Sequence, residues 1–370
     1  MSTTITTKKR AQFHALQVAD VRHLTSDAIE VTFSVPDELA YAFEYEPGQY
    51  VGIKQELEGE PLRRSYSICQ APAPGRLKVA IKRDLGGLFS SWAVEHLEPG
   101  MRLEVMSPDG RFTSRWVGTR PAHYAAIAAG SGITPILALV ENALHADDAS
   151  TFALVYSNRT TQDTMFLDEL ADLKDRYLAR LELHHVLTRE RRSSDLLSGR
   201  LDAERINQIL DSLVRPAAID EWFLCGPFEL VQTCRDALSA HGVPDERVRY
   251  ELFSAGEGAN SPLPQHGRPV VIDAGTEVHT VEFLLDGTTS TVKTPKHSNE
   301  TILNAALRVR GDVPFACAGG VCGTCRAVVR EGTVDMAANY ALEPEELDRG
   351  YVLTCQSVPT SDRVCVDYDA

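Results

Sequence analysis

The chain has 370 residues, 43% of them hydrophobic, and a formal net charge of −15 at pH 7. This length is enough for two or three domains, each with its own buried core. The acidic balance, with no basic stripe interleaved with aromatic residues, excludes nucleic acid as a partner. The lack of any apolar run of about 18 residues excludes a transmembrane helix and predicts no membrane partner.

The eight cysteines fall into two groups. Four lie near the C-terminus at a regular spacing. The other four are scattered through the chain: Cys69, Cys225, Cys234 and Cys365. Scattered cysteines are typical of a reducing compartment rather than of a disulfide framework. Because the N-terminal segment also lacks a long apolar stretch, we expect a cytoplasmic protein without a secretory signal.

The first part of the chain consists of short β-rich stretches separated by proline and glycine turns. We expect strands at His14–Leu24, Ile29–Val35, Tyr50–Gln55 and Leu77–Arg83. This pattern predicts an antiparallel barrel or sandwich, interrupted by one helix at Gly87–Leu97. The start of that helix offers Gly86, Gly87 and Ser90, which suit a phosphate because the first amides of a helix have no intrahelical partner. An ordinary helix cap is the simpler alternative.

A second motif, Arg64-Ser65-Tyr66-Ser67, lies on a β-rich stretch. On a strand, Arg64 and Tyr66 point to one face, and Ser67 points to the other. A cation for a phosphate and an aromatic ring for a flat cofactor then share a surface. The alternative is a strand that merely carries a surface arginine.

These two motifs resemble those of the ferredoxin–NADP reductase superfamily, whose flavin domain is a Greek-key barrel. The resemblance implies that Arg64 binds a flavin phosphate, that Tyr66 packs on the flavin, and that Ser67 lies near the reactive flavin nitrogen with a catalytic role. It implies FAD rather than FMN, with this set of contacting residues: Arg64, Ser65, Tyr66, Ser67, Gly86, Gly87, Leu88, Phe89 and Ser90.

Strands and helices alternate from about residue 123 onward. The expected strands are His123–Ala129, Phe152–Ser157, Leu181–Leu187 and Glu221–Cys225, and the expected helices are Ile136–His145, Gln162–Tyr177, Ala203–Leu213 and Phe228–His241. Alternation predicts a parallel sheet with right-handed crossovers. Ligands of such sheets bind at the carboxyl ends of the strands. The glycines Gly130 and Gly132 follow the first strand, where they allow a pyrophosphate to approach the backbone.

The same superfamily binds its nicotinamide coenzyme with motifs that resemble Gly-Ser-Gly-Ile-Thr-Pro and Cys-Gly-Pro in this chain. The implied coenzyme contacts are Gly130, Gly132, Ile133, Thr134, Pro135, Cys225, Gly226, Pro227 and Phe253. The resemblance places Cys225 beside the nicotinamide ring and Glu251 at the junction with the flavin, both with catalytic roles. The alternatives are an inert buried thiol at Cys225 and ordinary packing of the strand that carries Glu251.

The residues Ser157, Asn158 and Arg159 end the second strand of this region. NAD-preferring sites commonly place a carboxylate there, whereas an arginine accommodates a 2′-phosphate. The nearest carboxylate in the sequence, Asp163, comes after two threonines. The pattern therefore predicts NADPH, and the alternative is a solvated loop arginine.

The third region carries Cys317, Cys322, Cys325 and Cys355. The C-x4-C-x2-C spacing, with a distant fourth cysteine, is typical of a plant-type [2Fe–2S] cluster. A zinc site is the alternative, but zinc ligands usually come as two short pairs. The region resembles a plant-type ferredoxin with a β-grasp fold. The acidic residues Glu343, Glu345, Glu346 and Asp348 form a candidate docking surface or, equally, a solvated helix start.

We therefore predict a multidomain α+β protein with an antiparallel Greek-key barrel, an α/β parallel-sheet domain and a β-grasp domain. The expected limits are residues 8–116 for the FAD-binding barrel, 117–254 for the NAD(P)-binding domain, 255–267 for a linker and 268–370 for the ferredoxin domain. NADPH gives two electrons together, and a [2Fe–2S] cluster accepts one at a time, so a flavin is needed between them.

The whole arrangement resembles the reductase components of multicomponent oxygenases, and most of all the reductases of phenylacetyl-coenzyme A epoxidases. That resemblance implies electron flow from NADPH through FAD and the cluster to a di-iron oxygenase. Two alternatives stay open. One is an NADH-dependent reductase of a Rieske-type or other aromatic-ring oxygenase. The other is a redox-sensing binding protein.

Overall fold

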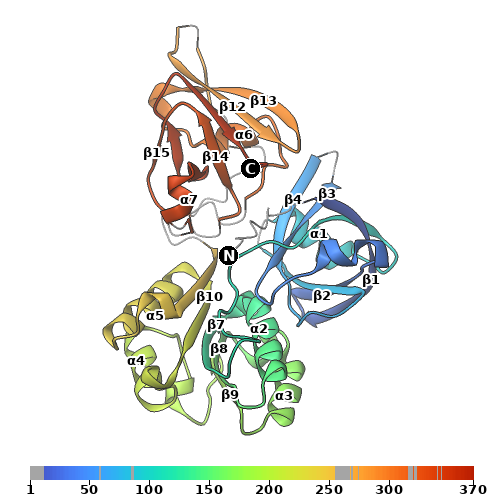
Figure 1. Ribbon diagram of the computed structural model, residues 1–370, viewed down its shortest axis with the longest axis vertical. Helices are drawn as coiled ribbons and strands as arrows, with labels where there is room; N and C mark the ends of the chain where they lie inside the picture. Colours follow the sequence, from blue (N-terminus) through green and yellow to red (C-terminus); the bar gives the residue numbers. More distant parts are fainter. Residues whose placement is uncertain are drawn as a thin grey trace, which may run out of the picture.

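The computed structural model has three lobes, which follow one another along the chain (Figure 1). It describes residues 12–57, 60–84, 87–254, 267, 270–273, 275–315, 320, 323–339, 341–342 and 344–370. Among these residues no helix is both long enough and apolar enough to cross a membrane. The candidate residues Gly86, Cys317 and Cys322 lie outside the described residues.

The first lobe is an antiparallel barrel of six strands in the order β4-β3-β6-β1-β2-β5. The strands are β1 (Phe13–Thr25), β2 (Ala28–Ser34), β3 (Tyr50–Leu57), β4 (Glu60–Ser67), β5 (Arg76–Lys82) and β6 (Arg102–Met106). A bridge between Ile68 and Val79 joins the two ends of this order and closes the sheet. Inward side chains from every strand fill one core, and α1 (Leu88–His96) covers it through Phe89 and Ala93. The predicted Greek-key barrel is confirmed.

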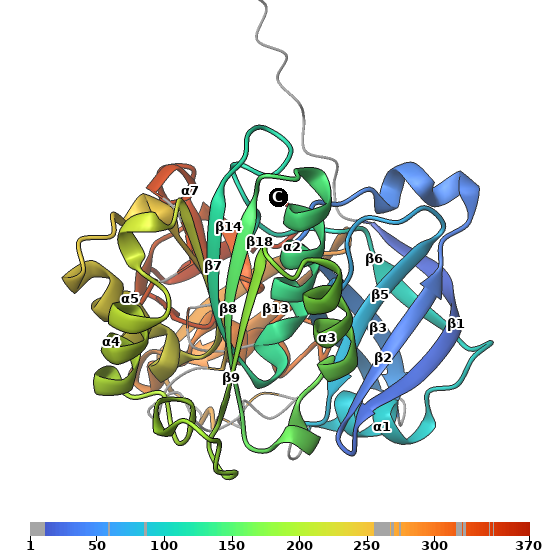
Figure 2. The ribbon, with the colours of Figure 1, turned by 90° about the horizontal axis from the view of Figure 1, so that it is seen from below.

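The second lobe is a parallel sheet with helices on both faces (Figure 2). Its strand order is β11-β10-β7-β8-β9, and its elements are β7 (His123–Ala129), α2 (Ile133–Ala146), β8 (Thr151–Asn158), α3 (Leu167–Arg176), β9 (Leu181–Leu187), α4 (Ala203–Ser212), β10 (Glu221–Pro227), α5 (Phe228–Ala240) and β11 (Val248–Ser254). The helices α2 and α3 cover one face, and α4 and α5 cover the other. The strands are apolar on both faces because both are buried.

The third lobe is a five-stranded mixed sheet that packs on α6 (Ile302–Leu307). Its order is β13-β12-β18-β14-β16, with β12 (Val278–Leu285), β13 (Thr288–Pro295), β14 (Arg326–Glu331), β16 (Tyr351–Leu353) and β18 (Arg363–Asp367). A second small sheet pairs β15 (Val334–Met336) with β17 (Ser357–Pro359) and was not predicted from the sequence. The short helix α7 (Pro344–Asp348) precedes β16.

One predicted helix is wrong in its first part. We expected a continuous helix over Gln162–Tyr177, but the chain forms a 3₁₀ turn at Thr161–Asp163 and begins α3 only at Leu167. Between them Phe166 adopts a left-handed conformation, with φ of 58°. Its buried ring anchors this kink in the core, so tertiary packing overrides the helical periodicity of the sequence.

A buried carboxylate joins the first lobe to the second. Glu221 is 1% exposed and accepts a hydrogen bond of 2.6 Å from the Ser114 hydroxyl and one of 3.3 Å from the Arg115 amide, both on the connecting segment. The Arg249 guanidinium donates to the same carboxylate at 3.4 Å. A buried charge must be paired in this way to be tolerated.

We expect Glu221→Ala to lower the free energy of unfolding of this lobe by about 2 to 4 kcal/mol, because it leaves Arg249 and Ser114 without their partner. Urea unfolding followed by tryptophan fluorescence, to which the adjacent buried Trp222 contributes, measures the change. The control is Glu182→Ala, whose side chain is 63% exposed and whose removal should change stability by less than about 0.5 kcal/mol.

Candidate functional site

The flavin-binding residues predicted on the first lobe lie on β4. The Arg64 guanidinium is half-buried and donates to the Arg63 carbonyl at 2.8 Å. No carboxylate in the described part of the chain forms an ion pair with it, and burial lowers its pKa. A partly desolvated cation of this kind fits a phosphate. Ser65 and Ser67 flank Tyr66 on the same strand.

The Tyr66 ring lies against Phe89, with ring centroids 5.8 Å apart. Phe89 is 1% exposed and belongs to the barrel core, so it supports the Tyr66 ring on the side that faces the core. Burial raises the pKa of Tyr66, so the ring stays neutral. Leu88, at the start of α1, is 50% exposed. Tyr66 and Leu88 are therefore the apolar groups of this motif that remain available for a flat ring.

The N-terminus of α1 is fixed by Ser90. Its hydroxyl accepts a hydrogen bond from the Asp84 amide at 3.0 Å and donates to the Gly87 carbonyl at 3.4 Å. A Cβ on Gly87 would lie 2.7 Å from the Ser90 hydroxyl oxygen, so only glycine fits there without displacement. Ser90 thus shapes the turn at the start of a nine-residue helix. The first amides of a helix have no intrahelical partner, so they suit a phosphate.

The nicotinamide motifs meet at one very close backbone contact. A Cβ on Gly132 would lie 2.2 Å from the Cys225 carbonyl oxygen. Gly130 has φ of 54° and Gly226 has φ of 155°, both conformations that favour glycine. The turn containing Gly130 and Gly132 therefore packs directly against the Cys-Gly-Pro strand end. Ile133, Thr134 and Pro135 form the buried first turn of α2.

The Tyr156 hydroxyl holds this turn in place. It donates to the Gly130 carbonyl at 3.0 Å from the neighbouring strand β8. Tyr156 is fully buried. Sequence reasoning missed this contact, because an apolar strand residue gives no local signal of where its hydroxyl is directed.

The three predicted catalytic residues lie together where the first two lobes meet. Cys225 and Glu251 are paired neighbours on the parallel strands β10 and β11. The Ser67 hydroxyl, from the barrel, donates to Glu251 at 3.4 Å. Burial, with the Glu251 carboxylate nearby, raises the pKa of the Cys225 thiol. The thiol is therefore protonated and neutral at ordinary pH. Phe253, two residues beyond Glu251, packs against the core of the second lobe.

The residues proposed to select NADPH end β8, and their surroundings differ from expectation. Ser157 and Asn158 are buried. Arg159 is half-exposed but forms ion pairs with two carboxylates, Asp27 at 3.3 Å and Asp163 at 3.4 Å. The sequence indicated an arginine without a nearby acid, but Asp163 pairs with it in the structure. Asp27 could not be anticipated because it belongs to the barrel.

Two of the four predicted cluster ligands are described, and they lie close together. Cys325 and Cys355 are 2% and 4% exposed. The Thr354 hydroxyl and amide both donate to the Cys325 carbonyl, at 2.8 and 3.2 Å. Tyr368 donates to the Thr354 hydroxyl at 3.0 Å. Two buried thiols on adjoining segments fit a thiolate-bound cluster, which needs sulfur ligands shielded from water. Cys317 and Cys322 lie outside the described residues.

The three lobes meet around a cavity of about 250 Å³. Its lining comes from the end of the barrel, from β11 and from the ferredoxin-like lobe, and it includes Arg111, Glu251, Gly323, Arg326 and Glu346. Glu251 of the catalytic group and Gly323 of the cysteine loop thus border the same space.

Ion pairs hold the third lobe against the barrel. Arg326, next to Cys325, pairs with Asp109 of the barrel lobe at 3.2 Å and with Glu346 at 3.3 Å. Glu346 is 3% exposed and also pairs with Arg111 at 3.0 Å. The described acidic residues Glu345, Glu346 and Asp348 therefore do not all lie on one external docking surface, because Glu346 faces the junction. Glu343 lies outside the described residues.

Further contacts between these lobes involve Lys54 and Arg64. Lys54 of the barrel pairs with Asp286 and, at 3.8 Å, with Asp312 of the third lobe. The Phe315 ring lies 5.2 Å from the Arg64 guanidinium carbon. Phe315 precedes Cys317 by two positions in the sequence, so Arg64 of the flavin motif contacts a residue next to the cysteine motif.

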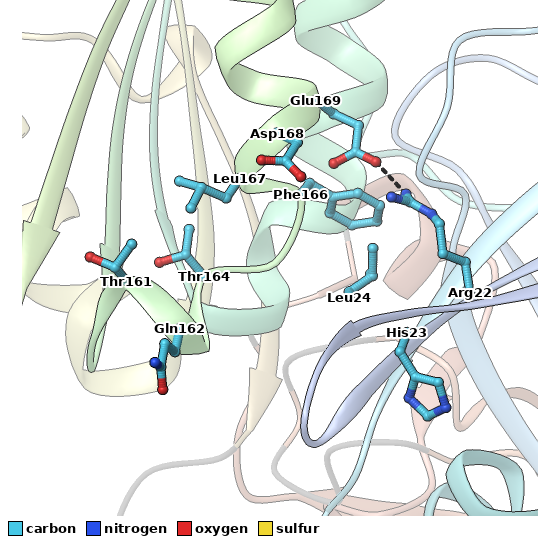
Figure 3. A pocket seen from close by; sticks show the side chains of 10 residues that line it. All are labelled: Arg22, His23, Leu24, Thr161, Gln162, Thr164, Phe166, Leu167, Asp168 and Glu169. Atoms are coloured by element: carbon cyan, nitrogen blue, oxygen red, sulfur yellow. Dashed lines mark hydrogen bonds and ion pairs between the residues drawn. The ribbon is translucent and has the colours of Figure 1, made fainter.

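A second crevice, of about 210 Å³, separates the barrel from the second lobe (Figure 3). Arg22 of β1 reaches across it to Glu169 of α3, with which it forms an ion pair. Thr161 and Gln162, which follow the Arg159 loop, line its opposite side. This crevice is a polar interface between the two lobes.

Comparison with protein families agrees with this division into three lobes. Residues 15–114 match an oxidoreductase FAD-binding domain, residues 126–236 an oxidoreductase NAD-binding domain, and residues 284–360 a 2Fe-2S iron-sulfur cluster binding domain. The site geometry fits the cofactors of these three domains. Arg64 is partly desolvated and suits a flavin phosphate, the turn at Gly132 suits the coenzyme, and the buried thiols suit the cluster. The site is therefore that of an NAD(P)H-dependent oxidoreductase with FAD and a [2Fe–2S] cluster.

Curated relatives extend the likeness over nearly the whole chain. The chain is 44% identical to the E component of the 1,2-phenylacetyl-CoA epoxidase of Escherichia coli (strain K12), over 97% of this chain and 98% of the relative. It is 36% identical to the ferredoxin reductase component of 3-ketosteroid-9-alpha-monooxygenase of Mycobacterium tuberculosis (strain CDC 1551 / Oshkosh), over 96% and 95%.

Among solved structures, phthalate dioxygenase reductase shares the fold, with a TM-score of 0.60 and 24% identity over 96% of this chain and 98% of that one. The chain belongs to the family of flavin- and [2Fe–2S]-containing oxygenase reductases that includes the E component of phenylacetyl-CoA epoxidase.

We expect Gly132→Ala to slow reduction of the bound flavin by NADPH about a hundredfold, because the new methyl group must push the coenzyme turn away from the Cys225 carbonyl, and small misplacements have effects of this size. Stopped-flow absorbance measures the rate. Visible absorbance of flavin and cluster should be retained, since neither motif is touched. The control is Gly100→Ala, where a Cβ would meet no atom within 4 Å but the φ of 96° strains any side chain. A normal rate in this variant shows that backbone strain away from the coenzyme turn does not slow flavin reduction. A normal rate in Gly132→Ala contradicts the prediction.

Proposed function

We propose that the chain is the NADPH-dependent reductase component of a phenylacetyl-CoA epoxidase, and that it passes electrons through FAD and the [2Fe–2S] cluster to a di-iron oxygenase. The observation that carries the proposal is the 44% identity over nearly the full length to the E component of that epoxidase, against 36% to the 3-ketosteroid monooxygenase reductase.

The geometry supports a short electron route. Ser67 of the flavin motif contacts Glu251 of the coenzyme motif at 3.4 Å, and Arg64 of the flavin motif contacts Phe315 beside the cysteine loop. When bound, a flavin accepts two electrons with a hydride and gives them up singly. The protein contributes to this transfer by holding the flavin, coenzyme and cluster motifs near one junction.

Cys225, Ser67 and Glu251 can hold a proton or orient the nicotinamide ring. The neutral Cys225 thiol is unsuited to nucleophilic attack, so we assign it to contact with the nicotinamide ring. Ser67 donates a hydrogen bond to the Glu251 carboxylate, which borders the junction cavity. These two residues therefore provide a hydroxyl and a carboxylate at the place where a proton must enter or leave with the hydride.

We also propose the domain limits 8–116, 117–254, 255–267 and 268–370, which agree with the family matches at 15–114, 126–236 and 284–360. A cytoplasmic location is proposed from four scattered cysteines, which form no disulfide in the described part of the chain: Cys69, Cys225, Cys234 and Cys365.

The proposal predicts the order of events in anaerobic stopped-flow. Mixed with NADPH, the holoprotein should show loss of flavin absorbance first and of cluster absorbance second, and NADPH should react faster than NADH. Reconstitution with a di-iron oxygenase and phenylacetyl-CoA should then give substrate-dependent NADPH oxidation. A preference for NADH, with activity only toward a Rieske-type oxygenase, would favour the alternative reductase.

Removal of one thiol tests the cluster assignment. We expect Cys355→Ala to lose the visible absorbance of the cluster and electron delivery to the oxygenase, while flavin absorbance and NADPH-ferricyanide activity stay within about twofold of wild type, because the flavin and coenzyme motifs lie on other lobes. The matched control is Cys365→Ala, a half-buried cysteine of the same lobe outside the predicted ligand set. Full cluster absorbance in Cys355→Ala would contradict the assignment.

A further inference from the structure

The Arg159 side chain, at the carboxyl end of β8, is half-exposed and lies between two carboxylates from different parts of the chain. Its guanidinium is 3.3 Å from an Asp27 oxygen and 3.4 Å from an Asp163 oxygen. Its side chain is 46% exposed, so a ligand can reach it. In this state the cation is already neutralised.

The two carboxylates differ in what else they do. Asp163 belongs to the same loop as Arg159 and accepts a hydrogen bond of 2.8 Å from the Thr160 hydroxyl, so it is part of the local turn. Asp27 comes from the hairpin between β1 and β2 of the flavin barrel. It accepts a hydrogen bond of 2.7 Å from Thr25 and lies 3.6 Å from Lys82. Asp27 therefore keeps local partners when Arg159 is taken by another anion.

We propose that Asp27 is a specificity-determining residue for the coenzyme: it pairs with Arg159 across the boundary between the flavin and coenzyme lobes and competes with the 2′-phosphate of NADPH for the same guanidinium. This inference rests on the proposed use of NADPH.

Electrostatics supports the displacement of Asp27 from Arg159 by a 2′-phosphate. Ion pairs between partly exposed groups are weak, because solvent and salt screen the two charges. A phosphate monoester carries more charge than a carboxylate and accepts several hydrogen bonds from a guanidinium. The phosphate therefore wins the competition, but its affinity is reduced by the broken pair and by repulsion from Asp27. Removal of the Asp27 charge should strengthen binding of a 2′-phosphate and leave unphosphorylated nucleotides unaffected.

The second ion pair across the same boundary supplies a matched control. Arg22 and Glu169 join the barrel to α3 in the crevice beside the Arg159 loop (Figure 3). Glu169→Gln removes one carboxylate charge from an ion pair between the same two lobes, as Asp27→Asn does, but it leaves the partners of Arg159 in place. An effect of general loosening between the lobes would appear in both variants.

The test is isothermal titration of the full-length holoprotein with 2′,5′-ADP and with 5′-AMP, two ligands that differ only in the 2′-phosphate. We expect Asp27→Asn to bind 2′,5′-ADP about threefold to tenfold more tightly than wild type and to bind 5′-AMP unchanged. Glu169→Gln should match wild type for both ligands. Arg159→Gln should bind 2′,5′-ADP about tenfold to a hundredfold more weakly.

Two results overturn the inference, and they are distinguishable. If Arg159→Gln leaves the affinity for 2′,5′-ADP unchanged, Arg159 does not bind the 2′-phosphate, and the NADPH part of the proposed function fails together with this inference. If Arg159→Gln weakens binding but Asp27→Asn behaves like Glu169→Gln, the proposed function stands and the competition by Asp27 is refuted.

Discussion

The position of the ferredoxin-like lobe against the barrel lobe depends on one buried carboxylate, which pairs with an arginine from each of these lobes. Glu346 lies at the junction between Arg111 of the barrel lobe and Arg326 of the ferredoxin-like lobe. A buried charge is tolerated only where its partners are in place. Because Arg326 directly follows Cys325, this cluster of charges also fixes the cysteine-bearing segment beside the flavin lobe. The same cavity reaches Glu251, so the coenzyme site shares this constraint.

Contacts between lobes and contacts within motifs have different physical origins. Within the coenzyme motif, the approach of Gly132 to the Cys225 carbonyl is made possible by the absence of a side chain. Between lobes, buried apolar contacts such as that of Phe112 with Phe223 occur beside ion pairs such as Arg22–Glu169 and Lys54–Asp286. Pairs of this kind weaken as salt screens them. The ionic part of these interfaces therefore responds to ionic strength.

Much of the fold could be predicted from the sequence, because the signals for these strands lie within short stretches of the chain. The strands at His123–Ala129 and Leu181–Leu187 have the predicted bounds, because apolar runs flanked by polar turns mark their own ends. The helix expected from Gln162 was wrong at its start, since the buried ring of Phe166 imposes a kink that periodicity does not record. The motif residues could be proposed from the sequence because their spacing within each motif is short.

What the sequence did not predict are contacts between residues far apart in the chain. Asp27 and Arg159 are separated by 132 positions, and neither residue type predicts the other. The same holds for Arg64 and Phe315, and for Tyr156, whose hydroxyl gives no sign in the sequence of the carbonyl it contacts. These contacts depend on how the lobes and strands pack.

The positions of Cys325 and Cys355, the two described residues of the predicted cluster ligand set, have a consequence for the stability of the third lobe. Cys325 adjoins β14, and Cys355 follows β16, and these strands are paired neighbours in one sheet. An inorganic group bound to both thiols is a cross-link that closes the intervening chain into a loop and lowers the entropy of the unfolded state. Damage by oxygen to that group thus removes a covalent tie from the lobe as well as an electron carrier. Loss of the cluster in air therefore also destabilises the folded third lobe, and addition of reductant alone does not restore it.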